Sequence, residues 1–217
     1  EIAWLEKQHK RAAPSAPRVV LSGDKATESA VRDAAGGKAI LHFATHGFVR
    51  GSLNVKLRVP EDEALRLRGG LERHAESFDP FLMSGLALSG VNARITEGLD
   101  DGMLTALEVL GLDLEGAELA FLSACDTARG IEQAGEGVIG LVGGFTLAGA
   151  RQVVASLWPV EDEATAELVK RFYGGYLGKG RASAAASLRK AALDLRKDER
   201  FQAPRHWAAF GAYGPLR

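Results

Sequence analysis

The sequence is poor in cysteine and carries no excess of charge of either sign. Cysteine occurs once in 217 residues, which excludes an internal disulfide and a multi-cysteine metal site and favours a reducing compartment such as the cytoplasm. Lys and Arg number 27 against 28 Asp and Glu, for a net charge of -1. Because nucleic-acid binders usually carry a basic excess or stripe, we expect no direct contact with nucleic acid.

Long apolar runs are also missing. The longest, residues 138–150, is too short to cross a bilayer and is followed by Arg151. Residues 1–11 have no apolar signal core, so we expect no membrane association. The chain does not begin with Met, and we expect it to be part of a longer protein. Residues 1–17, charged and then rich in Ala and Pro, predict a helix remnant and linker from an upstream domain, followed by one domain over 18–217.

What the sequence does contain is an alternation of apolar strands and amphipathic helices. We expect strands at 18–22, 38–45, 85–89, 118–124, 152–157 and 207–213. We expect helices at 27–35, 105–111, 137–150, 161–176 and 182–196. This order predicts an α/β fold, a three-layer α/β/α sandwich around a mostly parallel sheet. The charged segment 60–80 predicts a long exposed loop or a small insertion.

Two of the predicted strands end in residues that can carry out acyl transfer. His46 and Gly47 follow the strand at 38–45, and Cys125 follows the strand at 118–124. Ligands bind beyond the carboxyl ends of parallel strands, which lie about 4.8 Å apart. If the two strands are neighbours, Cys125 would be a nucleophile and His46 its general acid and base. The amides of Gly47 and Cys125 would form the oxyanion hole.

Other interpretations of these residues stay open. A lone cysteine is often a small core residue, and a His-Gly pair after a strand is often a turn. Zinc binding by His42 and His46 is disfavoured because their helical spacing falls on a strand. The flanking glycines of a nucleophile elbow are missing around Cys125, and no Walker A or dinucleotide fingerprint occurs. We therefore expect no metal and no cofactor.

Several ordered blocks of the sequence resemble the CHAT domain family. They are LHFATHG at 41–47, SGLAL at 84–88, DGMLTA at 101–106, LSACDT at 122–127, GEG at 135–137, AGA at 148–150, VVASLW at 153–158 and WAAF at 207–210. The resemblance covers roughly residues 18–213. It implies a caspase-like fold and a cysteine endopeptidase of the clan that contains caspases and separase. By position, His46 and Cys125 match the family's catalytic dyad and Gly47 its oxyanion-hole glycine.

The resemblance also implies a setting for the domain. CHAT domains commonly lie at the carboxyl end of larger proteins, behind tetratricopeptide repeats that sense a signal, and they cut a protein substrate. A bacterial source and a role in defence or cell death are what the family suggests. Because both dyad members are present, the sequence favours an active enzyme over a latent or vestigial interaction module, which is the alternative function.

The sequence departs from the caspase pattern, and its specificity pocket is open to two interpretations. Ser123 and Ala124 precede the cysteine where caspases have Gln-Ala, so preference for Asp should not be transferred. Four residues beyond strand ends are candidates for substrate binding: Asp126, Trp158, Glu161 and Asp162. An acidic pocket would favour a basic residue before the cut. Alternatively, Asp126 and Asp162 cap helices.

Overall fold

The computed structural model describes residues 1–49, 53–54, 76–77, 80–92, 100–124, 134–178, 180 and 182–215. A six-stranded sheet has the strand order β5-β4-β1-β6-β7-β8. Its strands are β1 (Ile40–Val49), β4 (Ser84–Ala87), β5 (Met103–Thr105), β6 (Leu119–Ala124), β7 (Val153–Ser156) and β8 (Phe210–Tyr213). A separate antiparallel pair is formed by β2 (Leu53–Asn54) and β3 (Glu76–Ser77). Most of the charged segment 60–80 lies outside the described residues.

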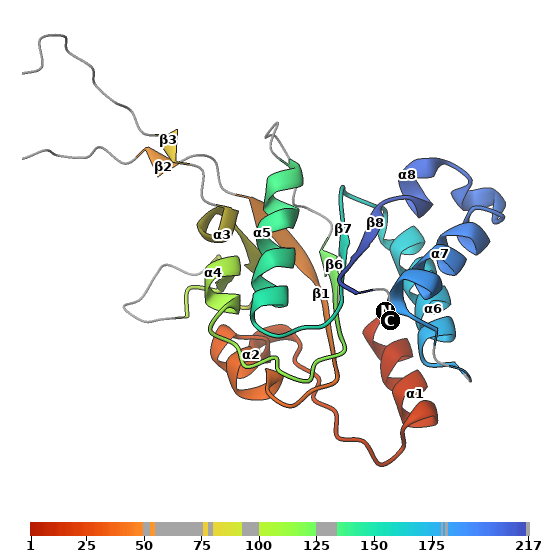
Figure 1. Ribbon diagram of the computed structural model, residues 1–217, viewed down its shortest axis with the longest axis horizontal. Helices are drawn as coiled ribbons and strands as arrows, with labels where there is room; N and C mark the ends of the chain where they lie inside the picture. Colours follow the sequence, from red (N-terminus) through yellow and green to blue (C-terminus); the bar gives the residue numbers. More distant parts are fainter. Residues whose placement is uncertain are drawn as a thin grey trace, which may run out of the picture.

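Helices cover both faces of the six-stranded sheet (Figure 1). They are α1 (Ile2–Ala12), α2 (Glu28–Ala35), α3 (Pro80–Met83), α4 (Ala106–Val109), α5 (Ala134–Leu147), α6 (Asp162–Tyr176), α7 (Ala184–Leu195) and α8 (Pro204–Trp207). The helices α2, α3, α4 and α5 lie on one side, and α1, α6, α7 and α8 on the other. None of the described helices is both long and apolar enough to cross a membrane.

The sheet is mixed but mostly parallel. The central strands β1, β6 and β7 run parallel to one another. β4 and β8 run antiparallel to their neighbours β1 and β7, and β5 runs antiparallel to β4. Four of the six strands therefore share one direction, and the predicted α/β/α sandwich is confirmed.

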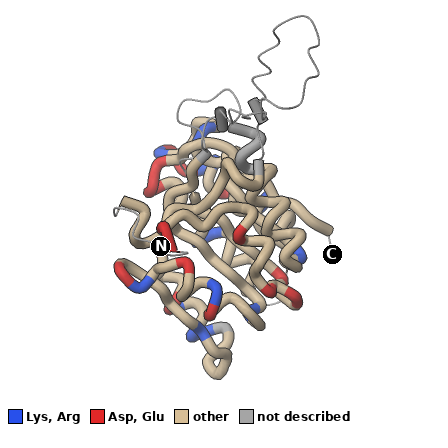
Figure 2. Tube along the Cα trace, turned by 90° about the vertical axis from the view of Figure 1, so that its left-hand side faces the viewer, with Lys and Arg blue, Asp and Glu red and all other residues tan. Residues whose placement is uncertain are grey.

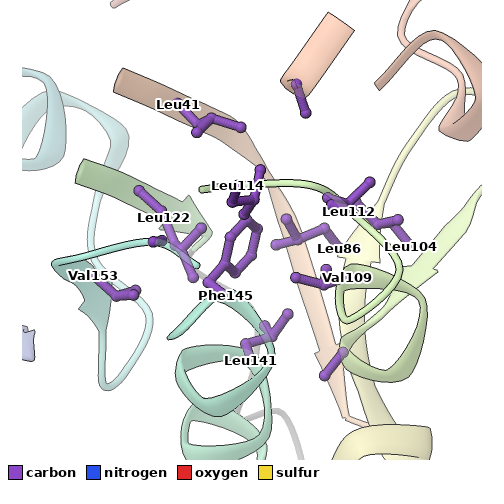
Figure 3. Close-up of a cluster of buried hydrophobic side chains, with 14 of the residues drawn as sticks. Leu41, Leu86, Leu104, Val109, Leu112, Leu114, Leu122, Leu141, Phe145 and Val153 are labelled. Carbon is purple, nitrogen blue, oxygen red and sulfur yellow. The ribbon is translucent and has the colours of Figure 1, made fainter. Parts of the chain in front are cut away.

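Two apolar cores lie on the two faces of the sheet. The first packs α2, α4 and α5 against the strands, with Phe145 of α5 among leucines from several strands (Figure 3). The second packs α6 and α7 against the opposite face, with Phe121 of β6 at its centre. Trp4 and Leu5 of α1 pack on this second core. The strands are nearly continuously apolar because both of their faces are covered.

Local sequence signals fix several helix starts. Thr27 caps α2 by accepting a hydrogen bond from the amide of Ala30. Thr105 and Glu108 form a capping box at the start of α4, which is expected over 105–111. The strand expected at 18–22 is wrong, since these residues are extended without pairing in the sheet. There, Val19 and Val20 are exposed, and β-branched side chains favour a strand only where the sheet gives them a surface to pack on.

A partly buried polar cluster attaches α1 to the sheet. The Nε2–H of His42, on β1, donates to the Glu1 carboxylate at 2.6 Å, and its Nδ1 lies 3.0 Å from the Tyr173 hydroxyl on α6. The other carboxylate oxygen of Glu1 accepts from the Ser123 hydroxyl on β6 at 3.5 Å. Burial raises the pKa of Tyr173 well above its ordinary value, and the charge of Glu1 adds to the effect. The Tyr173 hydroxyl therefore stays protonated and can donate to His42.

The strand β1 is longer than the sequence predicts. The apolar run predicts an end at Thr45, but the strand continues to Val49 because residues 46–49 pair antiparallel with β4. Phe48 lies opposite Gly85 of β4 in this ladder. A Cβ at Gly85 would lie 2.5 Å from the Phe48 ring and 2.7 Å from the carbonyl oxygen of Leu104. The extension of β1 thus depends on the missing side chain of Gly85.

We predict that Gly85→Ala lowers the free energy of unfolding by about 1–3 kcal/mol, because the added methyl group overpacks the space between Phe48 and β5. Urea unfolding measures this change. Gly174→Ala is the matched control. Gly174 is an exposed residue of α6 with no neighbouring atom within 4 Å of an added Cβ, so its substitution should raise stability by about 0.5–1 kcal/mol. Equal effects in both variants would contradict the role of Gly85.

Candidate active site

The strands that carry the predicted dyad are neighbours. β1 and β6 pair in parallel from Ile40 opposite Leu119 to Thr45 opposite Ala124. Thr45 is followed by His46, and Ala124 is followed by Cys125. Cys125 and Asp126 lie outside the described residues. The described register therefore ends one residue short of both predicted catalytic positions.

His46 lies at the carboxyl edge of the parallel part of the sheet, where its side chain is exposed. It pairs with Ala87 of β4. Side chains alternate between the faces of a strand, so His46 shares the face of Ile40 and His42, which is the face covered by α6 and α7. On β6, Phe121 and Ser123 belong to this same face.

The buried Gly47 presents its backbone amide to the β6 side of β1. The carbonyl of Ala39 points to β6, because it accepts from the amides of Glu118 and Leu119 at 2.8 and 3.2 Å. The polar groups of successive residues in a strand point to opposite sides, so the odd-numbered residues of β1 up to Gly47 share this direction. The N–H of Gly47 consequently points into the space beyond Ala124.

Three of the predicted substrate-binding residues follow β7, the next strand of the parallel set. Trp158 is half-buried, and its indole N–H donates to the carbonyl of Arg205 at 3.0 Å. Glu161 and Asp162 are exposed at the start of α6. The expectation that Asp162 caps this helix is wrong. Glu161 occupies the N-cap position without a side-chain cap bond. Asp162 lies in the first turn of the helix, where the helix dipole stabilises its negative charge.

The structure adds basic neighbours that the sequence interpretation missed. Arg205 and His206 of α8 approach the Glu161 carboxylate, with N–O distances of 3.8 and 3.6 Å. They are more than 40 residues away in the chain, so no local pattern indicates the contact. Lys and Arg are also interspersed with Asp and Glu along the described chain as a whole (Figure 2). An acidic pocket that included Glu161 would therefore be partly neutralised by these neighbours.

Ser156 is another residue near the site that the sequence patterns do not single out. It is the last residue of β7, is buried, and its hydroxyl donates to the carbonyl of Ala124 at 2.9 Å. The signal that could have found it is a lone hydroxyl at the end of an otherwise apolar strand. It links the carboxyl ends of two neighbouring parallel strands.

The imidazole of His42 has its hydrogen-bond partners outside the candidate site. Both of its ring nitrogens have partners, Glu1 and Tyr173, and its ring stacks on Phe121. Four residues along a strand span about 13 Å, so one metal ion cannot bind His42 and His46 together. Among the described residues, no cluster of three or more His, Cys, Asp or Glu could hold a metal ion.

Comparison with known proteins shows the family to which the chain is similar. Residues 1–215 match the model of the CHAT domain. Tetratricopeptide repeat protein 28 of Mus musculus is 31% identical over 201 residues, which cover 89% of this chain and 8% of that protein. Tetratricopeptide repeat protein 28 of Homo sapiens is 29% identical over 201 residues, with the same coverage. The chain therefore spans about 8% of the length of these curated relatives.

The matched region includes the long β1 with His46 and Gly47, the adjacent β6, and the strand β7 with its following turn. A family model that covers nearly the whole sequence agrees with the α/β sandwich and with the resemblance of the sequence blocks. The chain belongs to the CHAT domain family, a caspase-like, peptidase-related family.

Proposed function

We propose that this domain is a cysteine endopeptidase that cleaves a partner protein through a Cys125–His46 dyad. The observation that carries the proposal is the parallel register of β1 and β6, which ends at Thr45 opposite Ala124. One further residue on each strand is His46 and Cys125. Neighbouring strands lie about 4.8 Å apart, so a one-residue continuation of this register would bring imidazole and thiol to the same edge and the same face.

The proposed chemistry is acyl transfer to sulfur. The Cys125 thiolate attacks the scissile carbonyl carbon, and the amides of Gly47 and Cys125 stabilise the oxyanion that forms. The C–N bond then breaks while the protonated imidazole of His46 gives its proton to the leaving amine. Water, deprotonated by His46, hydrolyses the thioester and restores the thiol. The direction of the Gly47 amide supports this arrangement, because the amide points into the space beyond Ala124.

The proposed substrate groove runs past the carboxyl ends of β6 and β7. We propose that the ring of Trp158 gives this groove an apolar surface and that Asp126, Glu161 and Asp162 give it negative charge. The ion pair of Glu161 with Arg205 reduces its share of that charge. A basic residue before the cut stays the preference that we propose, with Asp126 and Asp162 as its main determinants.

The partners and setting of the proposed enzyme follow from its family. We propose that the domain is the effector part of a larger protein in which tetratricopeptide repeats act as the sensor. Both relatives named above are called tetratricopeptide repeat protein 28. The single cysteine fits a reducing compartment, and we place the enzyme in the cytoplasm. A bacterial source and a role in defence or cell death stay predictions.

We predict that wild-type protein cleaves members of a fluorogenic tetrapeptide library that varies the residue before the cut, with basic residues preferred. Cys125→Ala should lower kcat/KM by at least about 10⁴-fold and His46→Gln by at least about 10²-fold, because each removes a group that acts on the reacting atoms. His9→Gln is the matched control on α1 and should stay within about twofold of wild type. Equal cleavage by all four proteins would contradict the proposal.

The rate of thiol alkylation separates the enzyme from a vestigial interaction module. Because the chain has a single cysteine, iodoacetamide labelling measured by mass spectrometry reports on Cys125 alone. We predict fast labelling that varies little between pH 6.5 and 8 and slows at least about tenfold in His46→Gln, since a neighbouring imidazolium stabilises the thiolate. Slow labelling that rises toward an ordinary thiol pKa of about 8.5, and that is the same in His46→Gln, would favour the interaction module.

A further inference from the structure

The side chain of Ser156 is hydrogen-bonded to Ala124, the last described residue of β6. Its hydroxyl is 2% exposed and donates to the Ala124 carbonyl oxygen at 2.9 Å. The ladder between β6 and β7 runs from Ala120 opposite Val153 to Leu122 opposite Ala155, so Ala124 lies beyond its paired part. At the end of β7, the amide of Leu157 donates to Ala209. The Ser156 hydroxyl thus bonds to Ala124 where the strands cease to pair.

The Ala124 carbonyl belongs to the peptide group whose nitrogen is that of Cys125. A trans peptide group is planar, and its C=O and N–H point in opposite directions. Because the C=O points to Ser156 on β7, the N–H of the same group would point to β1. From the other side, the amide of Gly47 points away from β4 and toward β6. Two amide donors would therefore face one space between the ends of β1 and β6.

We propose that Ser156 is a positioning residue for the oxyanion hole. By bonding to the Ala124 carbonyl, it fixes the peptide group that supplies the Cys125 amide, so that this amide and that of Gly47 act on the same oxygen. This inference rests on the proposed function of the dyad. Without the hydroxyl, the buried Ala124 carbonyl loses a donor, and its peptide group turns toward another one, because an unsatisfied buried carbonyl is unfavourable. The amide on the other end of that group turns with it.

Two reactions at the same sulfur test the inference. Iodoacetamide forms a carbon–sulfur bond and releases iodide, without a tetrahedral oxyanion. In the reaction with p-nitrophenyl acetate, the thiolate attacks the ester carbonyl, a tetrahedral oxyanion forms, and p-nitrophenolate leaves to give the acetyl thioester. Only the second reaction needs the oxyanion hole. Mass spectrometry of the labelled protein identifies the sulfur adduct, and Cys125→Ala gives the background for both reagents.

In Ser156→Ala we expect acetylation of Cys125 to slow about 10- to 100-fold, somewhat less than the loss of an oxyanion donor itself, while alkylation stays within about twofold of wild type. Ser156→Thr keeps the hydroxyl and should recover most of the acetylation rate. Ser187→Ala is the matched control. Ser187 is a buried serine of α7, also 2% exposed, and its substitution should change neither rate.

The outcomes distinguish the inference from the function on which it rests. If Ser156→Ala lowers the acetylation and alkylation rates equally, the defect is a general structural one and the positioning role is overturned. If the substitution changes neither rate, the role is overturned as well. Failure of Ser156→Thr to recover any acetylation, with its alkylation intact, also overturns it. If wild-type acetylation equals that of His46→Gln, the dyad itself is refuted, whatever the result for Ser156.

Discussion

The structure depends on the parallel pairing of β1 with β6. The two strands lie between the two apolar cores, so the ladder is fixed by backbone hydrogen bonds and by packing on both faces of the sheet. A slip of one residue would exchange the faces of every side chain in the slipped strand. It would move Leu41 out of one core or Phe121 out of the other, and this cost keeps the register in place. The position of His46 relative to the end of β6 follows from this constraint.

The antiparallel strand β4 gives the site its second constraint. It pairs with the last four residues of β1 and so keeps His46 and Gly47 in an extended conformation rather than in a turn. Extended backbone alternates its polar groups, which is why the amide of Gly47 points away from β4. The close approach of Phe48 to Gly85 belongs to this same ladder. If β1 ended at Thr45, as it would in a purely parallel sheet, His46 and Gly47 would have no pairing partner. The antiparallel strand β4 therefore fixes the conformation of these two residues.

The sequence predicts the central elements because their signals are local. Continuous apolar runs identify β1, β6 and β7, Thr105 and Glu108 mark the start of α4, and the four-residue period of Ala164, Leu168 and Phe172 marks α6. The contacts that complete the site are not local. The length of β1 is set by β4, about 40 residues away, and the bond of Ser156 to Ala124 spans 32 residues. Such contacts follow from strand order, which the local patterns do not contain.

The polar cluster at the start of α1 has a consequence for how the molecule unfolds. It consists of Glu1, His42, Ser123 and Tyr173. One carboxylate at the start of α1 bonds to side chains on both central strands, and a tyrosine of α6 bonds to the same imidazole. Separation of α1 from the sheet would remove the partner of a half-buried ring nitrogen of His42 and of the buried Ser123 hydroxyl, and it would expose Trp4 and Leu5. Fraying of this helix is thereby linked to loosening of the sheet, and the amino-terminal turn melts as part of one cooperative unit.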